Sequence, residues 1–465
     1  MSAAAGASAP AGAAGTAAAT AVVATSCPAC GAPLEVGETA NATACGHCRT
    51  RLVVTGRGRV LSYQIAPRIP AGEARASARF AAPQGGGAVR VGDPRLYLFP
   101  YHRLSGLQLR WSRPEDDSES DRRARLAKLP DGMRVLAEAA FAPRPRPVGP
   151  PVFAGRWLER TVSACEGSAL VPWSLGVRSS VLRLDLFRPP NPEAAAVVAA
   201  TVPLADALAR GPDAGPGAGV LHETVLHRLL ALVYFPFWVI EVRAGTRRHA
   251  AIVDGTAGTI TAWGVDPERL AVLVAPPAVA PPVLGFRPLV CPNCGWDLPV
   301  DPCEVVFHCA TCQRAWQLAP DRLEPVAYTL IAPPAAAGGG PLHHLPVWIV
   351  GRGGTGPRRR TFAPAFRFRQ LRRLVDLGRN LSRVDPPIRP QDGPSATPLG
   401  HCHLDRADAR ALADFVVAGL APEGASPRDL APPSETTLAW LPFGVGPYAF
   451  RDLFSGTSLP KRLLD

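Results

Sequence analysis

Lysine is almost absent from this chain of 465 residues, since Lys128 and Lys461 are the only two. The formal net charge of +12 is therefore carried by arginine. A base composition rich in G and C explains arginine in place of lysine, but not the surplus of bases over acids. That surplus favours anionic partners such as nucleic acid or phosphorylated ligands, and an ordinary basic surface is the alternative interpretation.

Long apolar runs are also missing. The most apolar run, Leu229 to Ile240, is shorter than the roughly 20 residues that a membrane span needs, and it contains Pro236. Residues 1–25 have no basic segment and no leucine-rich core, so they predict a disordered tail and not a secretion signal. We therefore expect a cytoplasmic protein without membrane contact.

Sequence motifs of the common catalytic classes are absent as well. The chain has no Walker phosphate loop, no dinucleotide-binding glycine motif and no Gly-x-Ser-x-Gly turn. His222 and His227 resemble the histidine pair of zinc proteases, but they are five positions apart instead of four. On a helix they would diverge by about 140°, so they could not share one metal. We expect no enzymatic activity.

The chain does contain two cysteine clusters with the same spacing, C-x2-C-x14-C-x2-C. The first consists of Cys27, Cys30, Cys45 and Cys48, and the second of Cys291, Cys294, Cys309 and Cys312. This spacing brings four soft ligands to one tetrahedral zinc ion. Because four protein ligands leave no open coordination position, we expect two structural Zn2+ ions per chain. Eight of eleven cysteines in such pairs favour a reducing compartment over disulfides.

Each cluster encloses an expected hairpin. Its strands are residues 34–36 and 40–44 around Gly37 in the first cluster, and 296–300 and 305–308 around Asp301-Pro302 in the second. Rubredoxin-like iron is the alternative metal, but Arg49 and Gln313 stand where rubredoxins usually have glycine. His47 and His308, beside the cysteines, are expected to pack against the sites.

The two clusters belong to an internal duplication. A shift of 264 residues (291 − 27) superimposes them, and similar segments follow each, Tyr63-Gln-Ile-Ala-Pro67 and Tyr328-Thr-Leu-Ile-Ala-Pro333. Proline–aromatic strands come next, around Pro100, Pro172 and Pro236 in the first half and around Pro346, Pro364 and Pro442 in the second. A turn closes each half, at Asp254-Gly-Thr-Ala-Gly258 and at Ser455-Gly-Thr457. The order of these segments, and not their spacing, indicates the repeat.

These features predict an α+β, β-rich fold with a duplicated unit, in which a four-cysteine zinc ribbon precedes a β module with a few helices. The expected parts are a disordered tail at 1–25, zinc ribbon 1 at 26–56, β-rich module 1 at 57–274, a linker at 275–288, zinc ribbon 2 at 289–320 and β-rich module 2 at 321–465. Helical periodicity occurs over 193–209, 221–232, 366–383 and 405–420, and Asp405 is expected to cap the last helix.

The first half resembles a group of bacterial zinc-ribbon proteins of unsettled function. In that group, a Cys-Pro-x-Cys-Gly ribbon precedes a Pro-Phe-Trp strand and a Val-Asp-Gly-x-x-Gly-x-Val hairpin. The matching residues here are the first four cysteines, Pro236-Phe-Trp238 and Ile252-Val-Asp-Gly-Thr-Ala-Gly258. The second half departs from the pattern because Leu453-Phe-Ser-Gly-Thr457 lacks the Asp-Gly. The resemblance implies a fold and supplies no activity.

One segment, 352–383, concentrates arginine around Phe362, Phe366 and Phe368. The arginines considered for nucleic-acid binding are Arg352, Arg358, Arg359, Arg360, Arg367, Arg369, Arg372 and Arg373. Arginine with interleaved aromatics suits phosphate contact and base stacking. The alternative is a solvated helix face whose phenylalanines belong to the core. His401-Cys402-His403 is a further compact set of soft ligands, for which no fourth ligand is spaced nearby.

Two functions remain from these observations. The favoured one is a non-enzymatic zinc-binding scaffold or adaptor that interacts with another protein, with purely structural metal. The alternative is a nucleic-acid-binding protein that uses the zinc ribbons and the basic segment 352–383.

Overall fold

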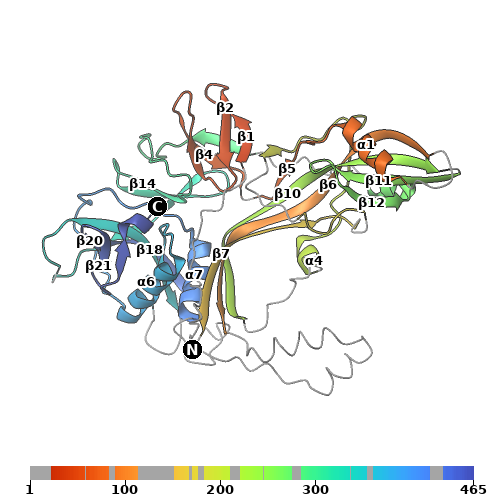
Figure 1. Ribbon diagram of the computed structural model, residues 1–465. Coiled ribbons are helices and arrows are strands. Elements are labelled where there is room, and N and C mark those ends of the chain that lie inside the picture. The colour runs from red at the N-terminus through yellow and green to blue at the C-terminus, as the bar shows by residue number, and fades with distance from the viewer. Residues whose placement is uncertain are drawn as a thin grey trace, which may run out of the picture.

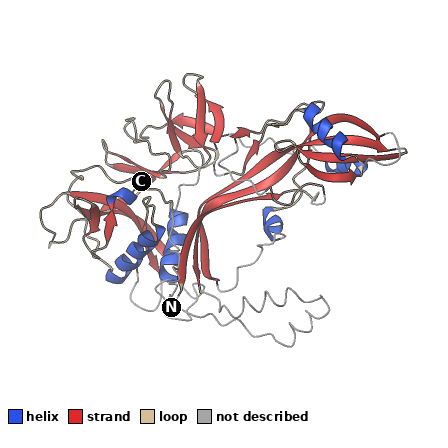
Figure 2. Cartoon of the chain, in the orientation of Figure 1, coloured by secondary structure: helices blue, strands red, loops and turns tan. Residues whose placement is uncertain are grey.

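The computed structural model describes most of the chain (Figures 1 and 2). The described residues are 22–57, 59–82, 89–113, 151–166, 170–175, 183–209, 220–244, 246–274, 284–335, 337–352, 360–418 and 433–464. Strands dominate and helices are few, which confirms the predicted β-rich class. Within these ranges, no helix combines the length and apolar character that crossing a membrane requires.

The longest strands of the first half are β6 (Val89–Ser112) and β10 (Val220–Ala244). They pair antiparallel, with Tyr234 opposite Pro100. Aromatic residues such as Phe235 and Phe237, which favour strands, are completely buried along β10. In Figure 1 the pair runs from the end that carries helix α1 (Ala71–Ala81) to helix α7 (Arg406–Ala418), so it spans both halves of the molecule.

The other strands of the first half extend this pair into a ten-stranded sheet. Its order is β12-β11-β10-β5-β8-β1-β2, and β6 also pairs with β7 and β9. The strands are β1 (Val22–Ser26), β2 (Pro33–Gly37), β5 (Leu61–Gln64), β7 (Val152–Ser163), β8 (Arg183–Leu186), β9 (Ala195–Val197), β11 (Arg247–Asp254) and β12 (Ile260–Val265). The short helices α4 (Leu204–Ala209) and α5 (Pro267–Leu273) complete this half.

The second half is built on a six-stranded sheet with the order β19-β18-β20-β21-β22, in which β17 pairs with β20. The strands are β17 (Tyr328–Leu330), β18 (Leu342–Arg352), β19 (Arg360–Pro364), β20 (Pro433–Val445), β21 (Ala449–Asp452) and β22 (Ser458–Pro460), followed by the 3-10 helix η3 (Lys461–Leu463). Helices α6 (Leu371–Val384) and α7 cover this sheet, and their buried residues join its core. The Asp405 side chain accepts a hydrogen bond from the amide of Asp408, as expected of a cap.

The two halves repeat one strand arrangement. β5 runs parallel to β10 just as β17 runs parallel to β20. The amide of Ile65 donates to the carbonyl of Tyr234 at 3.1 Å, and the amide of Ile331 donates to that of Trp440 at 3.0 Å. Pro100 faces Tyr234 across the β6–β10 pair, and Pro346 faces Trp440 across the β18–β20 pair in the same way. The duplication is therefore present in the hydrogen-bond register.

The register also corrects two details of the sequence-based match. The amide of Ala164 donates to Pro100, and that of Ala365 donates to Pro346, both at 2.9 Å. Residues 362–364 thus correspond to the end of β7 and not to the strand around Pro172. The closing hairpin of the second half does contain the aspartate, because Asp452 faces Phe443 as Asp254 faces Phe237.

Two expected helices are wrong. Residues 221–232 lie entirely within β10, where pairing with β6 overrides their helical periodicity. Of residues 193–209, only 204–209 are helical. Residues 195–197 instead form β9, which pairs with β6. The expected helices 366–383 and 405–420 are found as α6 and α7, with shorter bounds.

Two segments that are expected to be irregular each end in a strand. Residues 22–25 of the expected tail belong to β1, where Val23 is buried and pairs with Val36. Gly285–Pro288, at the end of the expected linker, forms β13. Strand β13 pairs with β4 (Arg51–Thr55), which in turn pairs with β3 (Ala42–Ala44). The segment between the halves therefore completes the sheet of the first ribbon.

Candidate metal centres

The four cysteines of the first cluster come from two tight turns. The first follows β1, where the amide of Gly31 donates to the carbonyl of Cys27 at 2.8 Å. The second follows β3, where the amide of Arg49 donates to the carbonyl of Cys45 at 2.9 Å. Both turns need a left-handed residue, and Gly31 and Arg49 have φ of 74° and 60°. The turns bring the Sγ pairs Cys27–Cys48 and Cys30–Cys45 each to 3.8 Å.

The second cluster repeats this geometry. Gly295 and Gln313 occupy the left-handed positions, with φ of 72° and 56°, and their amides donate to Cys291 and Cys309. The Sγ pairs Cys291–Cys312 and Cys294–Cys309 are each 3.6 Å apart. Arg49 and Gln313 therefore adopt the left-handed conformation that favours glycine, without being glycine.

Each cluster has the dimensions of a four-thiolate metal site. In each of them the four sulfur atoms lie within 4.8 Å of one another. Sulfurs about 2.3 Å from a tetrahedral metal would be about 3.8 Å apart, which matches the Sγ–Sγ distances. In each turn the first cysteine is buried at 1–2% exposure, while the second is nearer the surface. Both clusters could hold a metal ion, and neither offers an open coordination position to a substrate.

Local hydrogen bonds favour the thiolate form of one cysteine in each cluster, Cys48 and Cys291. The hydroxyl of Thr50 lies 3.1 Å from Cys48 Sγ. This contact and the amide of Thr50 lower the pKa of Cys48 to about 6. Burial raises the pKa of Cys291, but the amides of Cys294 and Asn293 outweigh it and the value falls to about 7. For Cys30 and Cys294, an amide hydrogen bond to each sulfur lowers the pKa, but burial and the neighbouring thiols outweigh it and raise the pKa of both to about 12.

The two ribbons share one hydrophobic core. Ala42 and Val53 of the first ribbon pack with Leu298, Phe307 and Trp316 of the second. The second ribbon has its own sheet of β14 (Val306–Cys309), β15 (Arg314–Leu318) and β16 (Leu323–Val326). The ribbons therefore pack on each other, although 264 residues separate their first cysteines. The other buried apolar residues of ribbon 1, such as Leu34 and Val54, join the core of module 1.

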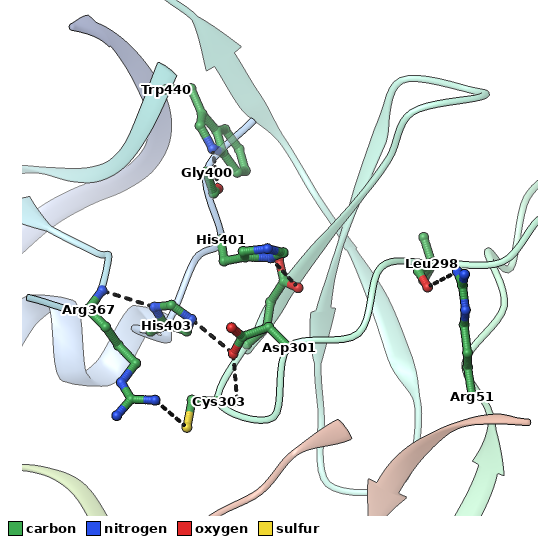
Figure 3. Close-up of polar contacts among 10 residues, drawn as sticks. Arg51, Leu298, Asp301, Cys303, Arg367, Gly400, His401, His403 and Trp440 are labelled. Carbon is green, nitrogen blue, oxygen red and sulfur yellow. Dashed lines mark hydrogen bonds and ion pairs between the residues drawn. The ribbon is translucent and has the colours of Figure 1, made fainter. Parts of the chain in front are cut away.

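Backbone hydrogen bonds reinforce this contact. The amide of Asn41 donates to the carbonyl of Pro302 at 2.6 Å, and the amide of Leu289 donates to Arg51 at 2.9 Å. The Arg51 guanidinium in turn donates to the carbonyl of Leu298 at 3.0 Å (Figure 3). Each ribbon thus satisfies polar groups of the other.

The expected hairpins inside the clusters are only partly correct. Strands occur at 33–37 and 42–44, but they belong to different sheets, because β2 pairs with β1 and β3 pairs with β4. Of the expected strand 296–300, only Asp297 makes an isolated bridge, to Val290. The other expected strand is β14, which pairs with β15.

A buried ion network fixes the first ribbon to its module. Arg103 of β6 is 4% exposed and donates to both oxygens of Glu38, with Nη2 at 2.8 Å from Oε2. Arg103 also pairs with Glu159 of β7. These ion pairs of the buried Arg103 and Glu38 with the partly buried Glu159 tie the spacer of ribbon 1, residues 31–44 between its two cysteine pairs, to β6 and β7.

His401 and His403 pair with acidic residues of the spacer of ribbon 2, which is residues 295–308 between its two cysteine pairs (Figure 3). His401 Nδ1 lies 3.0 Å from Glu304, and His403 Nε2 lies 3.1 Å from Asp301. His403 Nδ1 accepts a hydrogen bond from the amide of Arg367, so its other nitrogen carries the proton donated to Asp301. Cys402 is fully buried and its Sγ contacts the carbonyl of Leu404. In the described part of the chain, groups of three or more ligands that could hold a metal occur only in the two cysteine clusters.

His222, His227 and His308 belong to neither of the two candidate metal clusters. His222 lies on β10 near the ring of Phe415, and His227 has φ of 51° at an irregularity in the β6–β10 pair. They do not form a helical metal-binding pair. His308 lies 2.9 Å from the hydroxyl of Tyr328, and burial lowers the pKa of His308 to about 4.

The basic segment 352–383 does not form a stacking surface in the described residues. Phe362, Phe366 and Phe368 are at most 5% exposed and belong to the core of module 2. Arg352 pairs with Asp414, and Arg360 donates to Asp385 at 2.6 Å.

The other arginines of this segment differ in their surroundings. Arg367 contacts the spacer of ribbon 2, and Arg372 lies over Trp111. The amide of Arg369 donates to Leu463, and Arg373 is exposed on α6. Arg358 and Arg359 lie outside the described residues.

Comparison with known proteins identifies no relative. No protein-family model, no curated protein and no solved structure matches this chain significantly. The interpretation therefore depends on the geometry above.

Proposed function

We propose that this protein is a non-enzymatic scaffold that binds another protein, and that two structural zinc ions maintain its shape. The observation that carries the proposal is the common core of the two ribbons. Each ribbon also joins its own module, through β1 and β2 in the first half and through the bridge between Val306 and Cys402 in the second. Metal in the two packed ribbons would thus set how the two β modules are presented to a partner.

Zinc is the metal that fits best. Four thiolates in a closed tetrahedron are typical of structural zinc, and such ligands stay available in a reducing compartment such as the cytoplasm. The resemblance to bacterial zinc-ribbon proteins agrees with this choice and adds no activity. Closed coordination is also the reason to propose a binding role and not catalysis.

The second ribbon offers the surface best suited to a protein partner. Trp296 follows its first turn and is 66% exposed. Val290 lies beside it, since it bridges to Asp297, and is itself 36% exposed. Exposed tryptophan is enriched among the residues that dominate binding energy at protein interfaces. We therefore place the partner on this face of ribbon 2.

The test combines metal analysis with cross-linking to partners in lysate of the source cells. The purified chain should contain two zinc ions, and a partner should be captured by the wild type but lost with Trp296→Ala. Tyr448→Ala is the matched control, because Tyr448 is an aromatic residue with 86% exposure on another part of the surface. Fewer than two zinc ions, or capture unaffected by Trp296→Ala, would refute the proposal.

A mobility-shift assay with nucleic acid distinguishes the alternative function. Binding that weakens steeply between low and moderate salt would favour nucleic acid as the partner. No shift at low salt would leave the protein partner as the proposal.

A further inference from the structure

Cys303 differs from every other cysteine of the chain. Eight cysteines form the two clusters, and Cys165 and Cys402 are at most 2% exposed. Cys303 alone combines partial exposure with a position outside the clusters. It lies in the spacer of ribbon 2, six residues before Cys309, where a metal would not occupy its sulfur.

A guanidinium group lies against this sulfur. Arg367 Nη1 donates to Cys303 Sγ at 3.4 Å (Figure 3). The carboxylate of Asp301 accepts from the amide of Cys303 at 2.8 Å and from His403. A positive charge beside a thiol favours the thiolate, which is the nucleophilic form.

A second guanidinium, that of Arg57, interacts electrostatically with Cys303. Nη2 of Arg57 donates to the carbonyl of Gly37 at 3.1 Å, whereas Nε and Nη1 are inaccessible to solvent and have no hydrogen-bond partner among the described residues. Burial lowers the pKa of Arg57, and the neighbouring Tyr63, Glu38 and Cys303 oppose this effect. Buried donors without a partner are unfavourable, so an anionic oxygen within reach of Arg57 would be stabilised by donation from Nε or Nη1.

We propose that Cys303 is a peroxide-reactive thiol and that Arg367 and Arg57 stabilise its oxidised form. A lone pair of the thiolate attacks one oxygen of hydrogen peroxide or an organic hydroperoxide. The S–O bond forms as the O–O bond breaks, and hydroxide or alkoxide leaves and takes up the proton that the thiol had released to water. The sulfur is oxidised to sulfenic acid while the peroxide is reduced. The new oxygen lies where guanidinium N–H groups can donate to it.

The position of Cys303 connects this reaction to the rest of the molecule. The adjoining Pro302 accepts from Asn41 of ribbon 1, and Asp301 and Glu304 hold His403 and His401 of module 2. A change at Cys303 would therefore act where the two ribbons and module 2 meet. This inference does not depend on the identity of the partner.

The experiment uses the full-length, zinc-loaded protein with hydrogen peroxide and dimedone, which traps sulfenic acid. Peptide mass spectrometry should find the first adduct on Cys303, and Cys303→Ser should abolish it. Arg367→Met should slow its formation at least about fivefold, because it removes the charge that favours the thiolate. Arg373→Met, an exposed arginine of the same region, should stay within about twofold of the wild type.

Zinc content and melting temperature of each variant are measured first. If Arg367→Met does not fold, Arg57→Met tests the second guanidinium in the same assay, and a slower adduct rate is again expected. Adduct formation first on the zinc-binding cysteines, or rates at Cys303 that neither arginine affects, would overturn the proposal.

Discussion

The indole ring of Trp111 stacks on the ring of Phe415, with centroids 5.5 Å apart and an interplanar angle of 16°. Trp111 Nε1 also donates to the carbonyl of Phe415 at 3.2 Å. Trp111 lies on β6 of the first half and Phe415 on α7 of the second. The two halves therefore pack on each other at a second place, apart from the ribbons.

Trp111→Ala is expected to lower the free energy of unfolding by about 3–5 kcal/mol. The substitution opens a cavity at a site that is 4% exposed and removes the hydrogen bond to Phe415. Urea unfolding followed by circular dichroism measures the change. Trp296→Ala is the control and should shift stability by less than about 0.5 kcal/mol, because its side chain is mostly exposed. A loss below about 1 kcal/mol for Trp111→Ala would contradict the importance of this contact.

The cysteine clusters were predictable because their geometry is local. Two residues between paired cysteines fix the turn whatever the rest of the chain does, and the left-handed positions of Gly31 and Gly295 follow the same rule. α7 was predictable for a similar reason, since Asp405 and the apolar face of the helix lie close together in the sequence.

Long-range pairing was not predictable from such patterns. The residues of 221–232 have helical periodicity, but their partner is a strand more than 100 positions earlier. The position of Asp452 was missed because Leu453 stands where the first half has Gly255, so the Asp-Gly pair was absent from the second half. The common core of the ribbons was also hidden, since neither ribbon alone shows that Val53 meets Phe307.

Loss of one metal is expected to weaken the other site. Cys294→Ser removes a ligand of the second cluster, and the shared core transmits the disorder to the first ribbon. We expect the remaining zinc to be released to a chelator roughly tenfold faster than from the wild type, which corresponds to an activation free energy of release that is lower by about 1.4 kcal/mol. A colorimetric chelator assay measures this rate. Release at the wild-type rate would show that the ribbons behave independently.

The left-handed turn residues predict a difference between two glycines of the first ribbon. Gly31 has φ of 74°, whereas Gly46 has no left-handed conformation, and an added Cβ meets no atom within 4 Å at either position. Gly31→Ala should therefore destabilise the protein by about 1–2 kcal/mol through backbone strain alone. Gly46→Ala should have little effect. Thermal unfolding of the zinc-loaded variants compares them, and equal melting temperatures would argue against the strained turn.

Asp408 predicts a dependence of stability on pH. Its carboxylate accepts a hydrogen bond from the amide of His227 at 2.7 Å, where β10 meets α7. Burial, and the nearby Asp405, raise the pKa of Asp408 to about 7 against the weaker opposing effect of the His227 amide. The folded state therefore binds this proton more tightly than the unfolded state. Stability from this group is present at low pH and is lost as pH rises from about 4 to about 7.

Asp408→Asn isolates this effect, because asparagine keeps an oxygen for the His227 amide but cannot ionise. The stability of the variant relative to the wild type should rise by about 2 kcal/mol between pH 5.5 and pH 8. Urea unfolding at several pH values in this window measures the difference, and the window avoids the acid that would displace zinc from its thiolates. The wild type, unfolded at the same pH values, is the reference. A constant difference for Asp408→Asn would mean that this carboxylate is already ionised in the folded protein, and that the contact between β10 and α7 does not depend on its protonation.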